Sequence, residues 1–272
     1  GKKYTTLPEL EALYDPDKIR LRPSQADTPE VRKDMQGYMA MCTGCDIAFG
    51  RLMDTLKQQG MDDNTIIVFT SDHGDLPGAH GRPWAKSFPE DESCRVPLLI
   101  HYPKKLKPRS SELLVGTLDL MPTILGMMDL PIPDACDGQN LTPHILSGND
   151  DAVASVPLFY FIPSWRGVFT KDFTYSKRGP MNGKAKLEWN TLYDRKADPY
   201  QLKNRYYDED YAAKREELDK LTGAWLERFE DPFLNGYDLI KRLGFDTPKF
   251  SGTGKTGRPA GRPVDLLKPA GR

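Results

Sequence analysis

The sequence predicts an α/β chain: a layered sheet with helices, followed by a small C-terminal antiparallel sheet that a helix packs against. Two continuous apolar runs, 65–70 and 96–102, are typical of strands buried on both faces of a sheet. Helix-type spacing precedes the first run and follows the second, as in a layered α/β domain. From about residue 150 the pattern changes to short alternating segments separated by Pro, Gly and Asn, which predicts an antiparallel meander.

The N-terminal elements carry clear start and stop signals. Residues 1–29 are polar and interrupted by prolines, so we expect an irregular surface segment with a short amphipathic turn or two. A long helix is predicted over residues 30–59, because Thr28 can cap it, Pro29 suits its first position and Gly60 stops it. After the second apolar run, a further helix is predicted with Thr117 or Asp119 as its N-cap.

The C-terminal elements follow from the alternating segments. Strands are predicted at 157–162, 167–170, 173–175 and 187–192, and a helix over about 209–229 covers one face of that sheet. The chain therefore divides into an α/β part over residues 1–149, an antiparallel-sheet subdomain over 150–235, and an extended or disordered basic tail over 236–272.

Charge and length exclude some classes of protein. The 272 residues carry 38 Lys and Arg against 39 Asp and Glu, a net charge of −1, so bulk charge does not predict a nucleic-acid partner. No apolar run approaches the roughly 18–20 residues that span a membrane. The chain starts at Gly1 with neither an initiator Met nor a signal-peptide core, so we expect a fragment or a processed piece.

The strongest candidate site follows the first apolar run. Asp72 and His73 stand at its carboxyl end, the edge where open α/β sheets place their ligands. A carboxylate beside an imidazole can bind a divalent cation, and Gly74 lets the backbone turn away without a Cβ clash. The alternative reading is a polar strand-to-loop turn.

A long loop then returns toward the second apolar run. About twenty polar or small residues separate the two runs, and loops of that length are usually functional. Lys86 lies fourteen positions after Asp72, where its ammonium could reach an anion held by the metal. His80, in the same loop, is a candidate substrate-side contact. Lys86 and His80 are the candidate catalytic residues, and Asp72 and His73 the candidate metal ligands. The alternative for Lys86 is an ordinary surface lysine.

Over roughly residues 4–235 the sequence resembles the type I sulfatases of the alkaline phosphatase superfamily. The similar phrases are 60–74 ending in Ser-Asp-His-Gly, the helix start 117–123, 137–141, and the Tyr-Asp and Asp-Pro pairs of 192–199. The resemblance implies an alkaline-phosphatase-like fold and calcium-dependent hydrolysis of sulfate esters or N-sulfates. It also implies a formylglycine nucleophile made from Cys or Ser in a C/S-x-P-x-R motif.

The same resemblance implies roles for single residues. Asp72 and His73 would be two of the calcium ligands, and Lys86 would hold a sulfate oxygen. A hard cation and an ammonium group stabilise charge on the transferred group, and the aldehyde hydrate supplies the nucleophile. The implied substrate is a sulfated small molecule or glycan, and the family suggests export to the periplasm or outside the cell.

The sequence also departs from the family pattern. No C/S-x-P-x-R motif occurs in the 272 residues, and Cys94-Arg-Val-Pro97 has the right residue types in the wrong order. Asp62 and Asp63 precede their strand, so the role of the family's paired aspartates is not transferred to them. We therefore expect the later part of a sulfatase, inactive as an isolated chain because the nucleophile is missing.

Two alternatives remain open at this point. One is a phosphoester hydrolase or mutase of the same superfamily, which binds two transition metals and needs further histidine ligands. The other is a non-catalytic remnant that binds an anion or a glycan. One calcium ion per complete protein favours the sulfatase, and two zinc or manganese ions favour the phosphoester enzyme.

Overall fold

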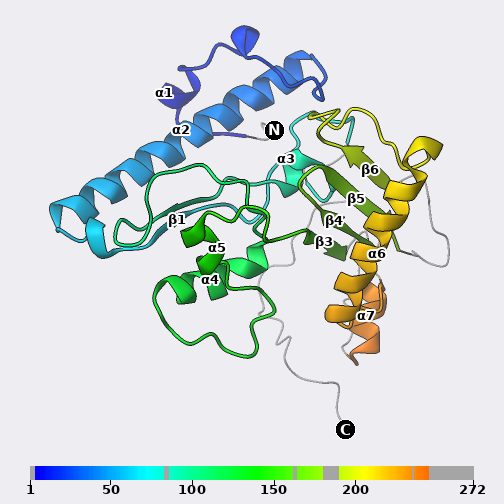
Figure 1. Ribbon diagram of the computed structural model, residues 1–272. Helices are drawn as coiled ribbons and strands as arrows, with labels where there is room; N and C mark the ends of the chain where they lie inside the picture. The colour runs from blue at the N-terminus through cyan, green and yellow to red at the C-terminus, as the bar shows by residue number, and fades with distance from the viewer. Residues whose placement is uncertain (1–3, 83–85, 162–163, 180–189, 235, 245–272) are drawn as a thin grey trace.

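The computed structural model describes residues 4–82, 86–161, 164–179, 190–234 and 236–244. Two parts are visible along the chain (Figure 1): an α/β part that ends near residue 150, and a four-stranded sheet with its helices. This is the α/β architecture that the sequence predicts.

The α/β part contains short elements around one long helix. Its α-helices and strands are α1 (Pro8–Glu11), α2 (Pro29–Gln58), β1 (Ile67–Phe69), α3 (Asp91–Cys94), β2 (Leu99–His101), α4 (Leu120–Met127) and α5 (Thr142–Ser147). Short 3-10 helices cover Pro16–Lys18, Asp62–Asn64 and Thr117–Asp119. In Figure 1 the β1–β2 ribbon runs between α2 and the α4–α5 pair.

Helix α2 begins and ends at the predicted signals. The Thr28 side chain accepts a hydrogen bond from the Val31 amide, and Pro29 opens the helix. The chain then turns through Gly60 at φ +63°, in the left-handed region that glycine adopts at low cost. Phe49 on α2 packs edge-on against Phe69 on β1, with 5.3 Å between ring centroids. The helix is thereby fixed on the ribbon.

Strands β1 and β2 form an antiparallel ribbon. Their register pairs Phe69 with Leu99, so the carboxyl end of β1 and the amino end of β2 share one edge. The loop between them therefore leaves and returns at that edge, as predicted. The prediction that both strands are buried on both faces is wrong, because Leu99 is 61% exposed. The reason is that no third strand pairs with the ribbon in the part of the chain that the structure describes.

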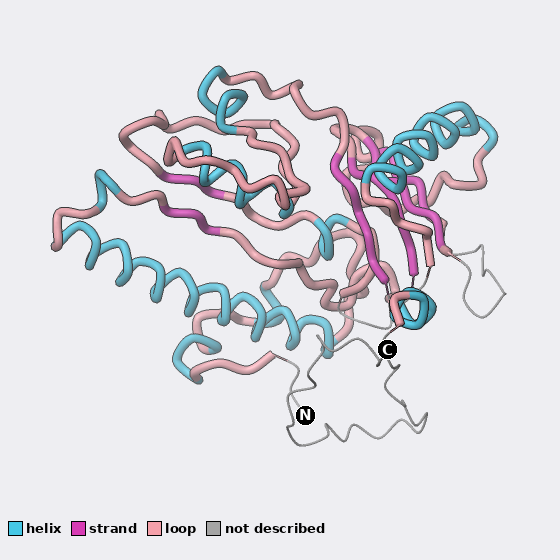
Figure 2. The backbone as a smooth tube through the Cα atoms, turned by 90° about the horizontal axis from the view of Figure 1, so that it is seen from below, coloured by secondary structure: helices cyan, strands magenta, loops and turns pink. Residues whose placement is uncertain are grey.

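The C-terminal subdomain confirms the predicted meander. Strands β3 (Val156–Phe161), β4 (Ser164–Phe169), β5 (Phe173–Arg178) and β6 (Thr191–Asp194) pair antiparallel in sequence order. Figure 2 shows this sheet apart from the short β1–β2 ribbon. Positions 187–189 of the last predicted strand lie outside the described residues.

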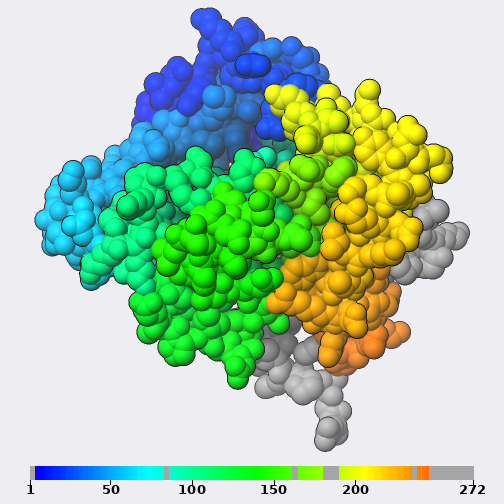
Figure 3. Space-filling model, in the orientation of Figure 1, coloured from blue at the N-terminus to red at the C-terminus, as the bar shows by residue number. Residues whose placement is uncertain are grey.

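Helix α6 (Ala212–Arg228), which follows a 3-10 turn at Glu209–Tyr211, covers that sheet. Leu218 on α6 joins Val168, Tyr175 and Leu192 of the sheet in one buried apolar cluster, as the predicted helix over 209–229 requires. On the face shown in Figure 3, α6 lies against the α4–α5 region, and Arg228 donates to the carbonyl of Asp137. The two parts of the chain are therefore in contact.

The predicted tail needs one correction. The sequence predicts an extended or disordered tail over 236–272, but Gly236–Arg242 form helix α7. Asp238 in its first turn and Lys241 and Arg242 in its last turn match the helix dipole, which favours a helix here. Residues 245–272 lie outside the described residues. Among the helices that are described, none is long and apolar enough to cross a membrane.

Candidate functional site

The predicted metal ligands lie where β1 ends and the loop begins. The Asp72 Oδ2 and His73 Nε2 atoms are 3.5 Å apart, and the side chains are 83% and 41% exposed. The His73 amide donates to Asp72 Oδ1 at 2.9 Å, and this bond, with the adjacent imidazole, lowers the pKa of the Asp72 carboxyl. The two side chains thus present an ionised oxygen and a ring nitrogen to the same region of solvent.

Lys86 returns to this pair. Its Nζ lies 2.9 Å from His73 Nε2, while His73 Nδ1 lies 2.7 Å from the Gly74 carbonyl oxygen. Because the carbonyl only accepts, Nδ1 carries the proton, and Nε2 keeps the lone pair that accepts from the Lys86 ammonium. This is the tautomer in which Nε2 can bind a metal. The structure brings together three of the four predicted site residues.

Gly74 fixes the Asp72–His73 turn against α3. Its amide donates to the Ser93 carbonyl at 2.8 Å, and a Cβ at this position would lie 2.0 Å from the Glu92 carbonyl oxygen. Glycine is therefore required by close backbone approach, which is consistent with the expected avoidance of a Cβ clash. The turn carrying both candidate ligands has little room to move toward α3.

His80 lies elsewhere on the loop, in a buried ionic group. Its Nε2 is 3.1 Å from Glu92 Oε2, and both side chains are 7% exposed. Ser24 Oγ donates to Glu92 Oε1 at 2.7 Å. Burial alone would raise the pKa of Glu92, but the hydrogen bonds from His80 and Ser24 outweigh it and lower the pKa to about 2. The predicted substrate contact of His80 stays a prediction, and its visible partner is Glu92.

A cavity of about 350 Å³ opens beside His80. Ser24 lines it from the N-terminal segment, and Tyr193 and Asn204 line it from the C-terminal subdomain. His80 therefore faces a polar space between the two parts of the chain.

A second buried acid in the loop was not singled out from the sequence. The Glu90 side chain is fully buried, forms an ion pair with Arg82 and accepts from the Tyr193 hydroxyl at 3.1 Å. Burial, then the Glu90 charge, raises the pKa of Tyr193. The sequence did hold one signal for a buried acid: three consecutive acidic residues, 90–92, lie just before an apolar strand. Glu90 anchors the end of the loop to β6.

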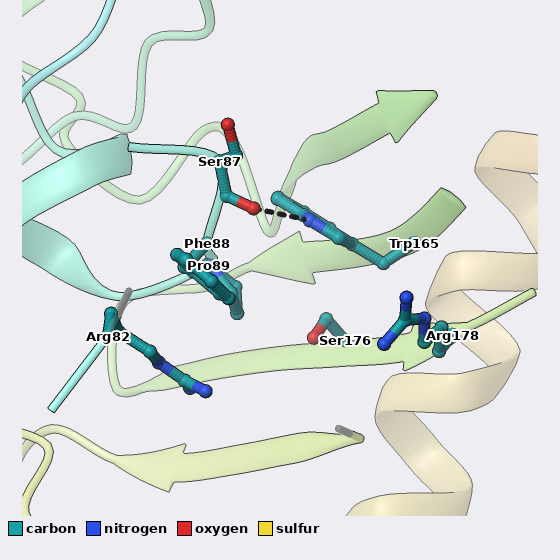
Figure 4. A pocket seen from close by; sticks show the side chains of 7 residues that line it. All are labelled: Arg82, Ser87, Phe88, Pro89, Trp165, Ser176 and Arg178. Carbon is teal, nitrogen blue, oxygen red and sulfur yellow. Dashed lines mark hydrogen bonds between the residues drawn. The ribbon is translucent and has the colours of Figure 1, made fainter. Parts of the chain in front are cut away.

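The four-stranded sheet also contacts the loop next to Lys86. The Trp165 indole N–H donates to the Ser87 carbonyl at 3.0 Å, as drawn in Figure 4. Ser87 Oγ donates to the Tyr160 hydroxyl at 2.6 Å. Trp165 is 8% exposed and packs at the junction. Only a water-sized space of about 10 Å³ remains there.

The Asp72–His73 pair offers few of the ligands that calcium takes. Asp72 and His73 supply two converging donors, whereas calcium takes six to eight, mostly oxygen, ligands. Across the described ranges, no group of three or more His, Cys, Asp and Glu side chains is placed to hold a metal ion. The two residues therefore supply fewer donors than a calcium ion takes.

Two family models match the chain. The model described as "Sulfatase" matches residues 8–130, and the model described as "N-sulphoglucosamine sulphohydrolase, C-terminal" matches residues 78–224. Together they include the Asp72–His73 turn, the loop and the four-stranded sheet.

Curated relatives agree with the family models. The endo-4-O-sulfatase of Bacteroides thetaiotaomicron is 30% identical over 247 residues, which are 84% of this chain and 48% of that protein. The ulvan-active sulfatase of Formosa agariphila is 31% identical over 248 residues, 86% of this chain and 47% of that protein. The chain thus spans about half the length of the curated relatives it matches.

Solved structures show the same fold. The Bacteroides fragilis protein yidJ, which carries a sulfatase assignment, matches with a TM-score of 0.75 and 30% identity over 84% of this chain and 51% of that one. A structure in complex with its substrate D-glucosamine-2-N,6-O-disulfate matches with a TM-score of 0.67 and 30% identity over 75% and 42%. The chain has the alkaline-phosphatase-like fold and belongs to the type I sulfatase family.

Proposed function

We propose that this chain supplies the later half of a sulfuric ester hydrolase, including part of its cation site and its sulfate-binding lysine. The observation that carries the proposal is the meeting of Asp72, His73 and Lys86 at one edge of the β1–β2 ribbon. Lys86 lies fourteen positions after Asp72 on the loop between β1 and β2, and Asp72 and His73 converge as metal donors do. The named sulfatases among the relatives support this assignment.

Each of the three side chains has a separate role in the proposal. The Asp72 carboxylate and His73 Nε2 hold a divalent cation, for which calcium is proposed, and the cation supplies charge stabilisation to the sulfate when bound. The Lys86 ammonium donates to a sulfate oxygen. Since Lys86 now donates to the His73 lone pair, cation binding frees this ammonium for the anion.

The nucleophile lies outside this chain in the proposal. Cys94 is no substitute, because its Sγ donates to the Phe88 carbonyl at 3.2 Å. Burial, followed by the charges of Glu90 and Asp91, raises the pKa of the Cys94 thiol to about 12. A thiol in this state is a poor nucleophile. We therefore expect no sulfate ester hydrolysis by the 272-residue chain alone.

Exposed apolar side chains on α2 and β2 support the proposal that another part of a sulfatase packs there. Of the 30 residues of α2, the buried ones are Gly37 and Ala40, whereas Ile47, Leu52 and Leu99 are 43%, 52% and 61% exposed. Helix α2 therefore buries little of its length in this chain, and these apolar side chains are accessible to a covering partner. Because the chain spans about half of its relatives, we propose that the remaining half of a sulfatase covers α2 and β2.

Sulfated glycans are the proposed substrate class. The support is the set of relatives, which includes an endo-4-O-sulfatase, an ulvan-active sulfatase and a protein bound to a disulfated glucosamine. The position of the sulfate on the sugar is left open by these relatives, since their names differ in it.

Complementation tests the proposal. The chain is co-produced with an N-terminal sulfatase half that carries C/S-x-P-x-R, in a host that makes formylglycine, and aryl sulfate hydrolysis is measured. We expect calcium-dependent turnover that falls by roughly 10²–10³ in Asp72→Ala and Lys86→Ala, the range for losing one charge-stabilising group. Asp62→Ala, at the other end of β1, is the matched control and should keep its activity.

Two results would count against the proposal. One is full turnover in both Asp72→Ala and Lys86→Ala. The other is a complemented enzyme that contains two zinc or manganese ions and hydrolyses phosphate esters instead, which is the outcome expected of a phosphoester hydrolase.

A further inference from the structure

Ser87, the residue after Lys86, has an unusual backbone conformation. Its φ is +86°, in the left-handed region that residues other than glycine rarely adopt. Such a conformation is costly and persists only where the surroundings hold it, commonly beside functional sites. Because rotation about the N–Cα bond of Ser87 moves the preceding peptide, this φ angle sets where Lys86 lies.

Two hydrogen bonds from one cross-strand pair hold Ser87. The Trp165 indole donates to the Ser87 carbonyl at 3.0 Å, and Ser87 Oγ donates to the Tyr160 hydroxyl at 2.6 Å. Tyr160 on β3 is directly opposite Trp165 on β4, and their rings stack with centroids 5.9 Å apart. One bond fixes the backbone of Ser87 and the other fixes its side chain.

The β3–β4 pair is itself anchored. Arg166 is fully buried, and its Nη1 donates to the Tyr160 carbonyl at 2.8 Å. Its Nε lies 2.5 Å from Asp231 Oδ2 in a buried ion pair. The backbone of Tyr160 and its neighbour Trp165 is therefore held from the side opposite Ser87, so the pair can act as a rigid support.

We propose that Trp165 and Tyr160 are positioning residues: by fixing Ser87 in its left-handed conformation, they hold the Lys86 ammonium at the Asp72–His73 pair. The four-stranded sheet thereby contributes to the site without touching the anion. The function assigned to that ammonium rests on the proposed sulfatase activity, whereas its placement does not.

The test uses the 272-residue chain and a distance readout. In NMR spectra, a nuclear Overhauser effect between the Lys86 CεH₂ protons and the His73 ring reports their contact. Trp165→Phe removes the indole N–H and keeps an aromatic ring, and we expect the cross-peak to weaken several-fold. Trp225→Phe is the matched control, because its indole donates at 3.0 Å to Ser155 in the same subdomain, and it should leave the cross-peak unchanged.

A second variant keeps the proposal testable if Trp165→Phe does not fold. Ser87→Ala removes only the hydroxyl that donates to Tyr160, and we expect a smaller weakening of the same cross-peak. An unchanged cross-peak in both folded variants would overturn the proposal. Equal weakening in Trp225→Phe would also overturn it, since the effect would then be general loosening of the sheet.

The complemented enzyme separates this inference from the proposed function. There, Trp165→Phe should lower kcat/KM for an aryl sulfate about tenfold or more and leave calcium affinity unchanged, whereas Asp72→Ala should lose calcium. If Trp165→Phe weakens the cross-peak but the complemented wild type hydrolyses no sulfate ester, the proposed function fails and the positioning role stands.

Discussion

Replacing Gly74 by alanine tests how tightly the candidate ligand turn is packed. A Cβ at Gly74 would lie 2.0 Å from the Glu92 carbonyl oxygen, whereas ordinary contacts begin at 3.4 Å. The turn and α3 must then separate by roughly 1.4 Å. That movement strains the 2.8 Å hydrogen bond from the Gly74 amide to Ser93. Overpacking of about 1–3 kcal/mol and a lost hydrogen bond of about 1 kcal/mol give roughly 2–4 kcal/mol.

Urea unfolding, followed by circular dichroism, measures this loss. The matched control is Gly50→Ala on α2, where nothing lies within 4 Å of the added Cβ, and it should raise the unfolding free energy by up to about 1 kcal/mol. The Lys86–His73 cross-peak should also change in Gly74→Ala, because the turn that carries His73 moves. A Gly74→Ala chain within about 0.5 kcal/mol of the wild type would refute the close-approach argument.

Three further changes address buried polar groups. Asp231→Ala removes one partner of the buried ion pair with Arg166 and should cost about 3–5 kcal/mol in urea unfolding, so a loss below about 1 kcal/mol would contradict it. Glu92 has its pKa lowered from 4.5 to about 2, so its contribution, roughly 1–3 kcal/mol, is present above pH 4.5 and lost as the pH falls toward 2. In Glu92→Gln the urea midpoint of unfolding should depend less on pH between 4.5 and 2 than in the wild type. The same pH dependence in both chains would argue against the pair with His80. Asp119→Ala removes acceptors for the amides of residues 116 and 139, both at 2.8 Å, and should lower the melting temperature by several degrees.

Local signals were enough to predict α2, α6 and the meander, but not α7. The cap at Thr28 and the stop at Gly60 act within one turn of α2, so the sequence around them determines its ends. The burial of β1 and β2 could not be predicted in the same way, because burial depends on neighbouring layers. Leu99 has an apolar side chain of the kind found in protein cores and yet lies exposed in this chain.

The candidate site was predictable only in part. Asp72, His73 and Lys86 could be placed together because the loop that carries them leaves and re-enters the ribbon at one strand edge. The left-handed conformation of Ser87 could not be predicted from the sequence, since serine has no preference for positive φ. The two side chains that hold it come from strands more than 70 residues away. The pairing of His80 with a buried acid likewise depends on tertiary contacts.

The short antiparallel ribbon has a practical consequence for handling the isolated chain. Each of its strands pairs on one side within the described residues, so the outer sides have no strand partner there, beside the exposed Leu99. Such edges recruit strands from other molecules and promote aggregation. Preparations should therefore self-associate as they are concentrated, and sedimentation measured over a dilution series should show the particles becoming smaller.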